Sequence, residues 1–155
     1  MQIEGKFSLQ GDIREIWDFL LDAGTLVSCI PGAEKVQAID DKTYECVVKQ
    51  KVGPISVKFQ FVTTLAEVRP PTFVKAVGKG SEAAKLGNFA QVTLVNLKEM
   101  PEHQVEVSYV SDVSVVGRLA TFGERIMRAK SKEVGEEFTR NLRKKLETRT
   151  AAAAK

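Results

Sequence analysis

The sequence predicts an α+β fold in which a curved, seven-stranded antiparallel sheet wraps around one long C-terminal helix. Three observations lead to this prediction. Segments that alternate between apolar and polar residues are separated by turn signals about every 8–12 residues between residues 34 and 116, which is typical of an antiparallel meander. The hydrophobic period then changes from two to 3.6 near Arg118. With 155 residues, 43% of them hydrophobic, the chain can bury a core without disulfides.

One strand and two short helices are expected before the meander. Residues 2–9 alternate between apolar and polar side chains, which predicts a half-buried strand. Asp12 and Glu15 have the spacing of a capping box, and apolar residues at helical spacing follow, so a helix is expected over 13–21. Thr25 is the expected cap of a second, shorter helix. The Pro-Gly pair that follows ends it, because proline lacks an N–H donor and glycine permits a turn.

Six more strands are expected after these helices. Strands that are neighbours in sequence usually pair, so one twisted sheet is the simplest arrangement. The segment Gly78-Lys79-Gly80 is too short for a phosphate-binding loop, and we expect a bulge or bend there. The predicted strands cover residues 34–39, 43–51, 55–65, 72–80, 85–97 and 104–116.

The chain from about residue 118 is predicted to form one long helix, with a bend near 131–135; two helices in line are the alternative. About 30 helical residues span roughly 45 Å, which is enough to cross the sheet. The volume enclosed between sheet and helix then decides the function. We expect one domain over residues 1–148 and a C-terminal tail over 149–155.

Composition and motifs exclude several classes of protein. No apolar run approaches the roughly 18 residues of a membrane span, and the N-terminus does not resemble a signal peptide, so we expect a cytoplasmic protein. Cys29 and Cys46 are too few for a disulfide framework or a zinc site, and neither has a basic neighbour that would activate it. The one histidine, His103, falls in a predicted turn. The motifs of common hydrolases and of phosphate loops do not occur.

The C-terminal segment is basic. Residues 118–155 hold 11 Lys/Arg against 5 Glu, whereas residues 1–117 hold 12 Lys/Arg against 15 Asp/Glu. Such a face either complements the helix dipole in solvent or contacts an anionic membrane or a partner. Nucleic acid is not expected, because no aromatic residues are interleaved with the charges. The candidate contact residues are Arg140, Arg143, Lys144 and Lys145.

Inward-facing side chains of the strands and the long helix are the candidate ligand-binding residues. Leu94 and Val113 are expected on the same inner face, and Asp112 on the outer one. The start of the helix is rich in small residues that leave space, and Tyr109 and Ser111 add hydroxyls to an apolar wall, as in pockets for small hydrophobic ligands. The alternative is that these side chains fill a core. The candidates are Val57, Phe59, Phe61, Val92, Val107, Tyr109, Leu119, Phe122, Gly123 and Ile126.

Several short motifs, in order, resemble the family of the carbon monoxide dehydrogenase G subunit, which belongs to the START-like, birch-pollen-allergen-like superfamily (SRPBCC). The resemblance covers about residues 1–148. It implies a helix-grip fold with a deep hydrophobic cavity. The motifs are Cys29-Ile30-Pro31-Gly32, Val52-Gly53-Pro54-Ile55, Pro70-Pro71, Gly78-Lys79-Gly80 and the segment from Gly117 to Arg125.

The resemblance also implies a function. Members are non-catalytic accessory proteins of molybdenum hydroxylases of the carbon monoxide dehydrogenase type, associated with membrane recruitment of that enzyme and with binding of a lipid quinone. We therefore expect a quinone-like ligand, no covalently bound cofactor, no metal, and peripheral contact with the inner face of the membrane. Two alternatives stay open: a polyketide cyclase-like enzyme that uses Tyr109 or Asp112, and a protein-docking module with a filled core.

Overall fold

A curved antiparallel sheet crossed by one long helix dominates this computed structural model, which describes residues 1–52, 54–82 and 87–153 and has seven strands within them. Strand β1 (Gln2–Gln10) leads into helices α1 (Ile13–Leu21) and α2 (Ala23–Cys29). A 3₁₀ helix, η1 (Arg118–Phe122), precedes the long helix α3 (Gly123–Ala153). The remaining strands are β2 (Ala33–Asp40), β3 (Thr43–Val52), β4 (Ile55–Arg69), β5 (Phe73–Glu82), β6 (Gly87–Met100) and β7 (Gln104–Gly117).

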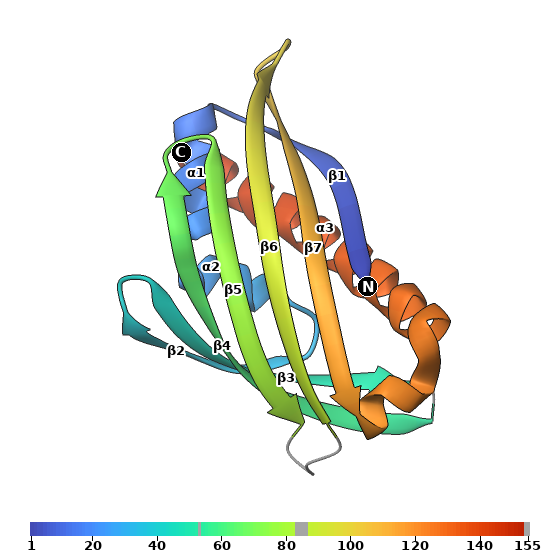
Figure 1. The fold of residues 1–155 in the computed structure, drawn as a ribbon. Helices are drawn as coiled ribbons and strands as arrows, with labels where there is room; N and C mark the ends of the chain where they lie inside the picture. Colours follow the sequence, from blue (N-terminus) through green and yellow to red (C-terminus); the bar gives the residue numbers. More distant parts are fainter. Residues whose placement is uncertain (53, 83–86, 154–155) are drawn as a thin grey trace.

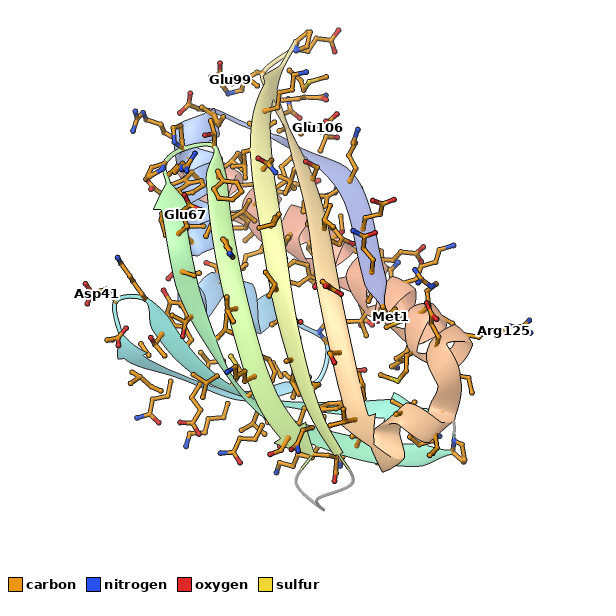
Figure 2. All side chains as sticks on the ribbon, in the orientation of Figure 1. Met1, Asp41, Glu67, Glu99, Glu106 and Arg125 are labelled. Carbon is orange, nitrogen blue, oxygen red and sulfur yellow. The ribbon has the colours of Figure 1, made fainter. Side chains whose placement is uncertain are left out.

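The strand order is β1-β7-β6-β5-β4-β3-β2, and each neighbouring pair is antiparallel. Strands β2 to β7 thus form a meander, and β1 pairs with the last strand. Figure 1 shows the sheet curving around α3, which runs diagonally behind the central strands and alongside β1. Met1 and Arg125 lie on the same side of the molecule, where β1 and α3 both begin (Figure 2). The predicted fold class is confirmed.

The core is divided unequally between the two ends of the sheet. At one end α1, α2 and the C-terminal half of α3 close over the strands, and Ile16 and Leu142 are fully buried there. The side-chain amide of Asn141 donates to the Cys29 carbonyl at 3.0 Å and fastens α3 to the end of α2. At the other end Val52 and Val57 form a smaller cluster. The bulk of the hydrophobic stabilisation therefore lies away from the start of α3.

The boundaries of two helices differ from the prediction. Helix α2 begins two residues before Thr25, whose hydroxyl donates to Asp22 Oδ2 at 2.7 Å from within the helix, so Thr25 is not its cap. The long helix does not start at residue 118. Gly117 and Gly123 have φ values of +88° and +83°, a region that residues with side chains rarely adopt. The turn at Gly117 separates η1 from β7, and the turn at Gly123 separates η1 from α3. From Gly123 to Ala153 the helix is continuous, which rules out two helices in line.

Candidate functional site

A pocket of about 200 Å³ lies between the concave face of the sheet and the first turns of α3. The strands supply most of its wall, and its sides are closed by Ile30, the residue after α2, and by Met127 of α3. Gln91 is the polar residue of the lining, and the others are apolar. The lining residues are Ile30, Val48, Phe59, Phe61, Phe89, Gln91, Val113, Val115 and Met127.

Three phenylalanines form the aromatic wall of this pocket. The ring centroid of Phe89 on β6 lies 5.4 Å from that of Phe59 and 5.7 Å from that of Phe61, both on β4, with interplanar angles of 88° and 66°. Edge-to-face pairs of this kind favour a fixed arrangement of the rings. The wall is therefore preformed and presents carbon and ring edges to the pocket.

Two glycines of β5 make room for the wall. A Cβ on Gly80 would lie 2.5 Å from the Phe61 Cβ, and one on Gly78 would lie 3.1 Å from Cγ and 3.3 Å from Nε2 of Gln91. The Gln91 side chain thus lies over Gly78, its partner across the β5–β6 ladder. The bulge expected at residues 78–80 is absent, because β5 keeps an unbroken register there with both neighbours. The two glycines therefore leave room for neighbouring side chains and do not change the register of the strand.

The predicted ligand-binding residues fall into separate places. Phe59 and Phe61 line the pocket. Val57 is fully buried in the smaller core cluster, where Phe122 packs against it. Val107 belongs to the larger cluster, and Tyr109 lines a different groove, between β1 and α3. Residues predicted to line one pocket therefore lie in four places: the pocket, the two core clusters and the groove.

The expected inward orientation of Val92 is wrong. Its side chain is 39% exposed on the outer face, as is that of Leu94 at 37%. Val92 pairs with Asp112 across the β6–β7 ladder, and directly opposite residues of an antiparallel pair share a face. Asp112 is exposed, as expected, so Val92 cannot face the pocket.

The helical contribution to the pocket is shifted by one residue. Ile126 is 45% exposed, and Met127 lines the pocket instead. A helix that starts at residue 118 would place Ile126 on the pocket side, but η1 and the break at Gly123 change the phase of the helix. A Cβ on Gly123 would meet no atom within 4 Å. The side chain of Leu119 lies outside the described part of the structure.

Other polar candidates do not reach the pocket. The Ser111 hydroxyl shares a 2.8 Å hydrogen bond with that of Thr93 and is used within the wall. His103 is exposed in the β6–β7 turn with a φ of +60°, in agreement with the prediction of a turn residue. Burial raises the pKa of the Cys46 thiol, with a smaller contribution from the charge of Glu45, so the thiol stays protonated above its usual range and is a poor nucleophile.

The basic residues at the end of α3 divide into two pairs. Arg143 donates to the Ser8 carbonyl at 3.2 and 3.3 Å, and Lys145 donates to the Ser28 hydroxyl, so both hold the helix on the body of the protein. Arg140 and Lys144 are exposed. The first pair therefore has a structural role that the sequence did not reveal.

Two further questions bear on function: whether side chains come together as metal ligands, and whether a helix could cross a membrane. No three His, Cys, Asp or Glu side chains in residues 1–52, 54–82 and 87–153 come together as metal ligands. In the same ranges, every helix is too short or too polar to cross a bilayer.

Comparison with known proteins points to one family and one fold. The sequence model of the family described as the carbon monoxide dehydrogenase G subunit (CoxG) matches residues 5–147. A conserved protein from Geobacillus kaustophilus has 20% identity and a TM-score of 0.87 over 96% of both chains. A START superfamily protein from Mycobacterium smegmatis has 11% identity and a TM-score of 0.74 over 95% of this chain and 97% of that one.

An aromatase/cyclase, Zhui, from a Streptomyces species also has 11% identity, with a TM-score of 0.73 over 99% of this chain and 97% of its own. Identities this low establish the shared fold alone, so the predicted helix-grip fold is confirmed. No curated protein matches the sequence.

Proposed function

The chain belongs to the CoxG family, that of the carbon monoxide dehydrogenase G subunit, and we propose that it is a non-catalytic accessory protein that holds an apolar, quinone-like ring compound. Its partner would be a molybdenum hydroxylase of the carbon monoxide dehydrogenase type. The observation that carries the proposal is the pocket itself, in which Gln91 presents one amide to a wall of apolar side chains. Fixed apolar walls with a few polar groups are the usual design of small-molecule sites.

The size of the pocket supports a ring as the bound group. An engineered apolar cavity of roughly 150 Å³ is known to hold benzene, so a pocket of about 200 Å³ accommodates a ring with a few substituents. A long lipid tail would have to lie outside it. Burial of the ring would supply most of the affinity, at about 25 cal/mol per Å² before the costs of ordering.

The amide of Gln91 suits both redox states of a quinone. Its N–H groups can donate to a quinone carbonyl, and its oxygen can accept from a hydroquinone hydroxyl. None of the lining residues is a titratable acid or base. The cyclase-like alternative therefore has no acid–base pair in the pocket, since Asp112 faces outward and Tyr109 lines the other groove.

Replacing Gln91 with leucine tests the proposal. The variant is expected to bind 2,3-dimethyl-1,4-naphthoquinone about tenfold more weakly, because the carbonyl loses its hydrogen bond. Its affinity for 2,3-dimethylnaphthalene, which has no carbonyl, should stay the same. Isothermal titration calorimetry of both ligands measures the difference.

Gln60→Leu is the matched control, since Gln60 lies on the outer face of β4 with its amide bonded to Glu45. It should bind both ligands as the wild-type protein does. If Gln91→Leu weakened binding of both ligands equally, or weakened binding of neither, the assignment of a polar contact to this amide would be contradicted.

We further propose a peripheral contact with anionic lipid through Arg140 and Lys144, which would bring the partner enzyme to the inner face of the membrane. Each basic residue near such a surface contributes about 1 kcal/mol. Arg143 and Lys145 contribute less, because they are bonded to the protein. Co-sedimentation with phosphatidylglycerol vesicles, with and without the Arg140→Glu/Lys144→Glu change, tests this contact. Unchanged sedimentation would exclude it.

A further inference from the structure

Strand β1 forms one edge of the sheet, and alternate residues direct their backbone groups away from β7. Met1 and Val113 exchange N–H···O bonds of 2.9 and 2.8 Å, so the odd-numbered residues of β1 are those that bond to β7. The even-numbered residues therefore point N–H and C=O groups at the free edge. An edge of this kind is a template for another extended chain.

Two arginines of α3 bond to carbonyl groups of this edge, one near the start of β1 and one six residues further along. Arg128 Nη1 donates to the Gln2 carbonyl at 2.8 Å, and Arg143 donates to the Ser8 carbonyl. Between them lie Glu4 and Lys6, whose edge-facing N–H and C=O groups bond to nothing among the described residues. The stretch of the edge between the two arginines is therefore a short unoccupied window from Glu4 to Lys6.

A groove of about 680 Å³ runs beside the window, between β1 and α3. Residues 3–8 of β1 form one wall, one face of α3 forms the other, and Tyr109 forms part of the floor. The Tyr109 hydroxyl lies 3.3 Å from the position that a Cβ on Gly135 would take, so the glycine lets the helix pass over the ring. An extended segment of about four residues is roughly 13 Å long, which matches the window and its two flanks.

The helical wall of the groove is positively charged. Lys132 and Arg140 are exposed there, and neither forms an ion pair within the described residues. Glu136 lies between them on the same wall. Carboxylates placed in the groove would meet these two cations, and the arginines at its ends would add to the field.

We propose that this groove binds an extended, acidic segment of a partner protein, which adds to β1 as an additional strand. The backbone groups of Glu4 and Lys6 pair with the segment, and its carboxylates face Lys132 and Arg140. A lipid surface provides negative charge but no backbone donors for the edge, which is why the unpaired window favours a peptide. The proposal does not depend on what occupies the apolar pocket.

The first test uses peptides alone. A fluorescein-labelled, capped heptapeptide that alternates glutamate and threonine is titrated with the wild-type protein at low salt, and fluorescence polarisation reports binding. A peptide with lysine in place of glutamate should not bind. Methylating one alternate set of backbone nitrogens should weaken binding at least about tenfold, and methylating the other set should not, because only one set faces β1.

Charge reversal tests the helical wall. The Lys132→Glu/Arg140→Glu variant should bind the acidic peptide at least about tenfold more weakly than the wild type does. Arg125→Glu/Lys144→Glu makes the same change in net charge at exposed residues of α3 outside the groove and should leave binding within about twofold. Both variants should bind the naphthoquinone normally, so a failure here is distinct from a failure of the pocket.

Several results would overturn the proposal. The first is that the acidic peptide does not bind. The second is that the two methylated peptides bind equally well, and the third is that the two double variants weaken peptide binding equally. A fourth result would also overturn it: a Lys132→Glu/Arg140→Glu variant that no longer binds phosphatidylglycerol vesicles but still binds the peptide. That result would show that these two cations contact the membrane and not a peptide.

Discussion

Replacing Gly32 with alanine is expected to lower the free energy of unfolding by about 3 kcal/mol or more. Gly32 has a φ of +81°, and a Cβ there would lie 1.9 Å from the carbonyl oxygen of Lys49. The obstacle is backbone, so rotation of a side chain cannot relieve it. Gly32 also accepts a 2.8 Å hydrogen bond from the Lys49 N–H, which a displaced loop would lose. Urea denaturation followed by circular dichroism measures the change.

Gly24→Ala is the matched control for this prediction. Gly24 lies in α2, and the nearest atom to its added Cβ would be Asp22 Oδ1, at 3.9 Å. Alanine is the better helix former, so this variant should be more stable than the wild type by up to about 1 kcal/mol. A Gly32→Ala protein within about 1 kcal/mol of the wild type would show that the loop before β2 yields easily.

Replacing Met127 with tryptophan is expected to weaken binding of the naphthoquinone at least about 100-fold. Met127 lines the pocket from α3, and the larger indole would occupy the volume that the ligand needs. Met127 is only partly buried, so the fold should tolerate the change. Calorimetry measures the affinity, and thermal unfolding checks that the variant is folded.

Ile126→Trp is the control, one residue earlier in the same helix. Ile126 is 45% exposed and does not line the pocket, so this variant should bind the ligand with wild-type affinity. If Ile126→Trp blocked binding and Met127→Trp did not, the phase of α3 proposed for the site would be wrong.

The contrast between these two residues shows where sequence reasoning reached its limit. The period of 3.6 identifies a helix and its apolar stripes, but the phase of the stripes depends on where the helix starts. Gly117 and Gly123 indicate where the helix starts, because a glycine on each side of a short segment favours turns over a continuous helix. If both are read as space-making residues within one continuous helix, the phase is wrong and Ile126 falls on the pocket side.

Strand β6 illustrates a second limit. Its two faces carry similar numbers of apolar residues, and Gln91 and Thr93 make the inner face look like the solvent side. Phe89 and Leu97 share the inner face and were the usable signal, since large apolar residues at the ends of a strand indicate its buried side. Gln91, the polar group of the pocket, was missed for the same reason.

The order of the elements was accessible because it depends on local signals. Alternation in β4, the turns between strands and the capping residue Asp12, which accepts from the Arg14 N–H at 3.1 Å, all act within a few residues. The contacts of Arg143 with Ser8 and of Gly80 with Phe61 join distant parts of the chain. Their roles follow from tertiary packing and have no local signature.

The methyl signal of Met127 gives the most direct test of the claim that the pocket holds an apolar ring. The chain has three methionines, and Met100 lies at the end of β6, outside the pocket. In protein labelled with ¹³C at the methionine methyls, titration with 2,3-dimethyl-1,4-naphthoquinone should shift the Met127 signal until it saturates and leave that of Met100 in place. A Met127 signal that does not move, or one that moves only together with Met100 and never saturates, would contradict the account.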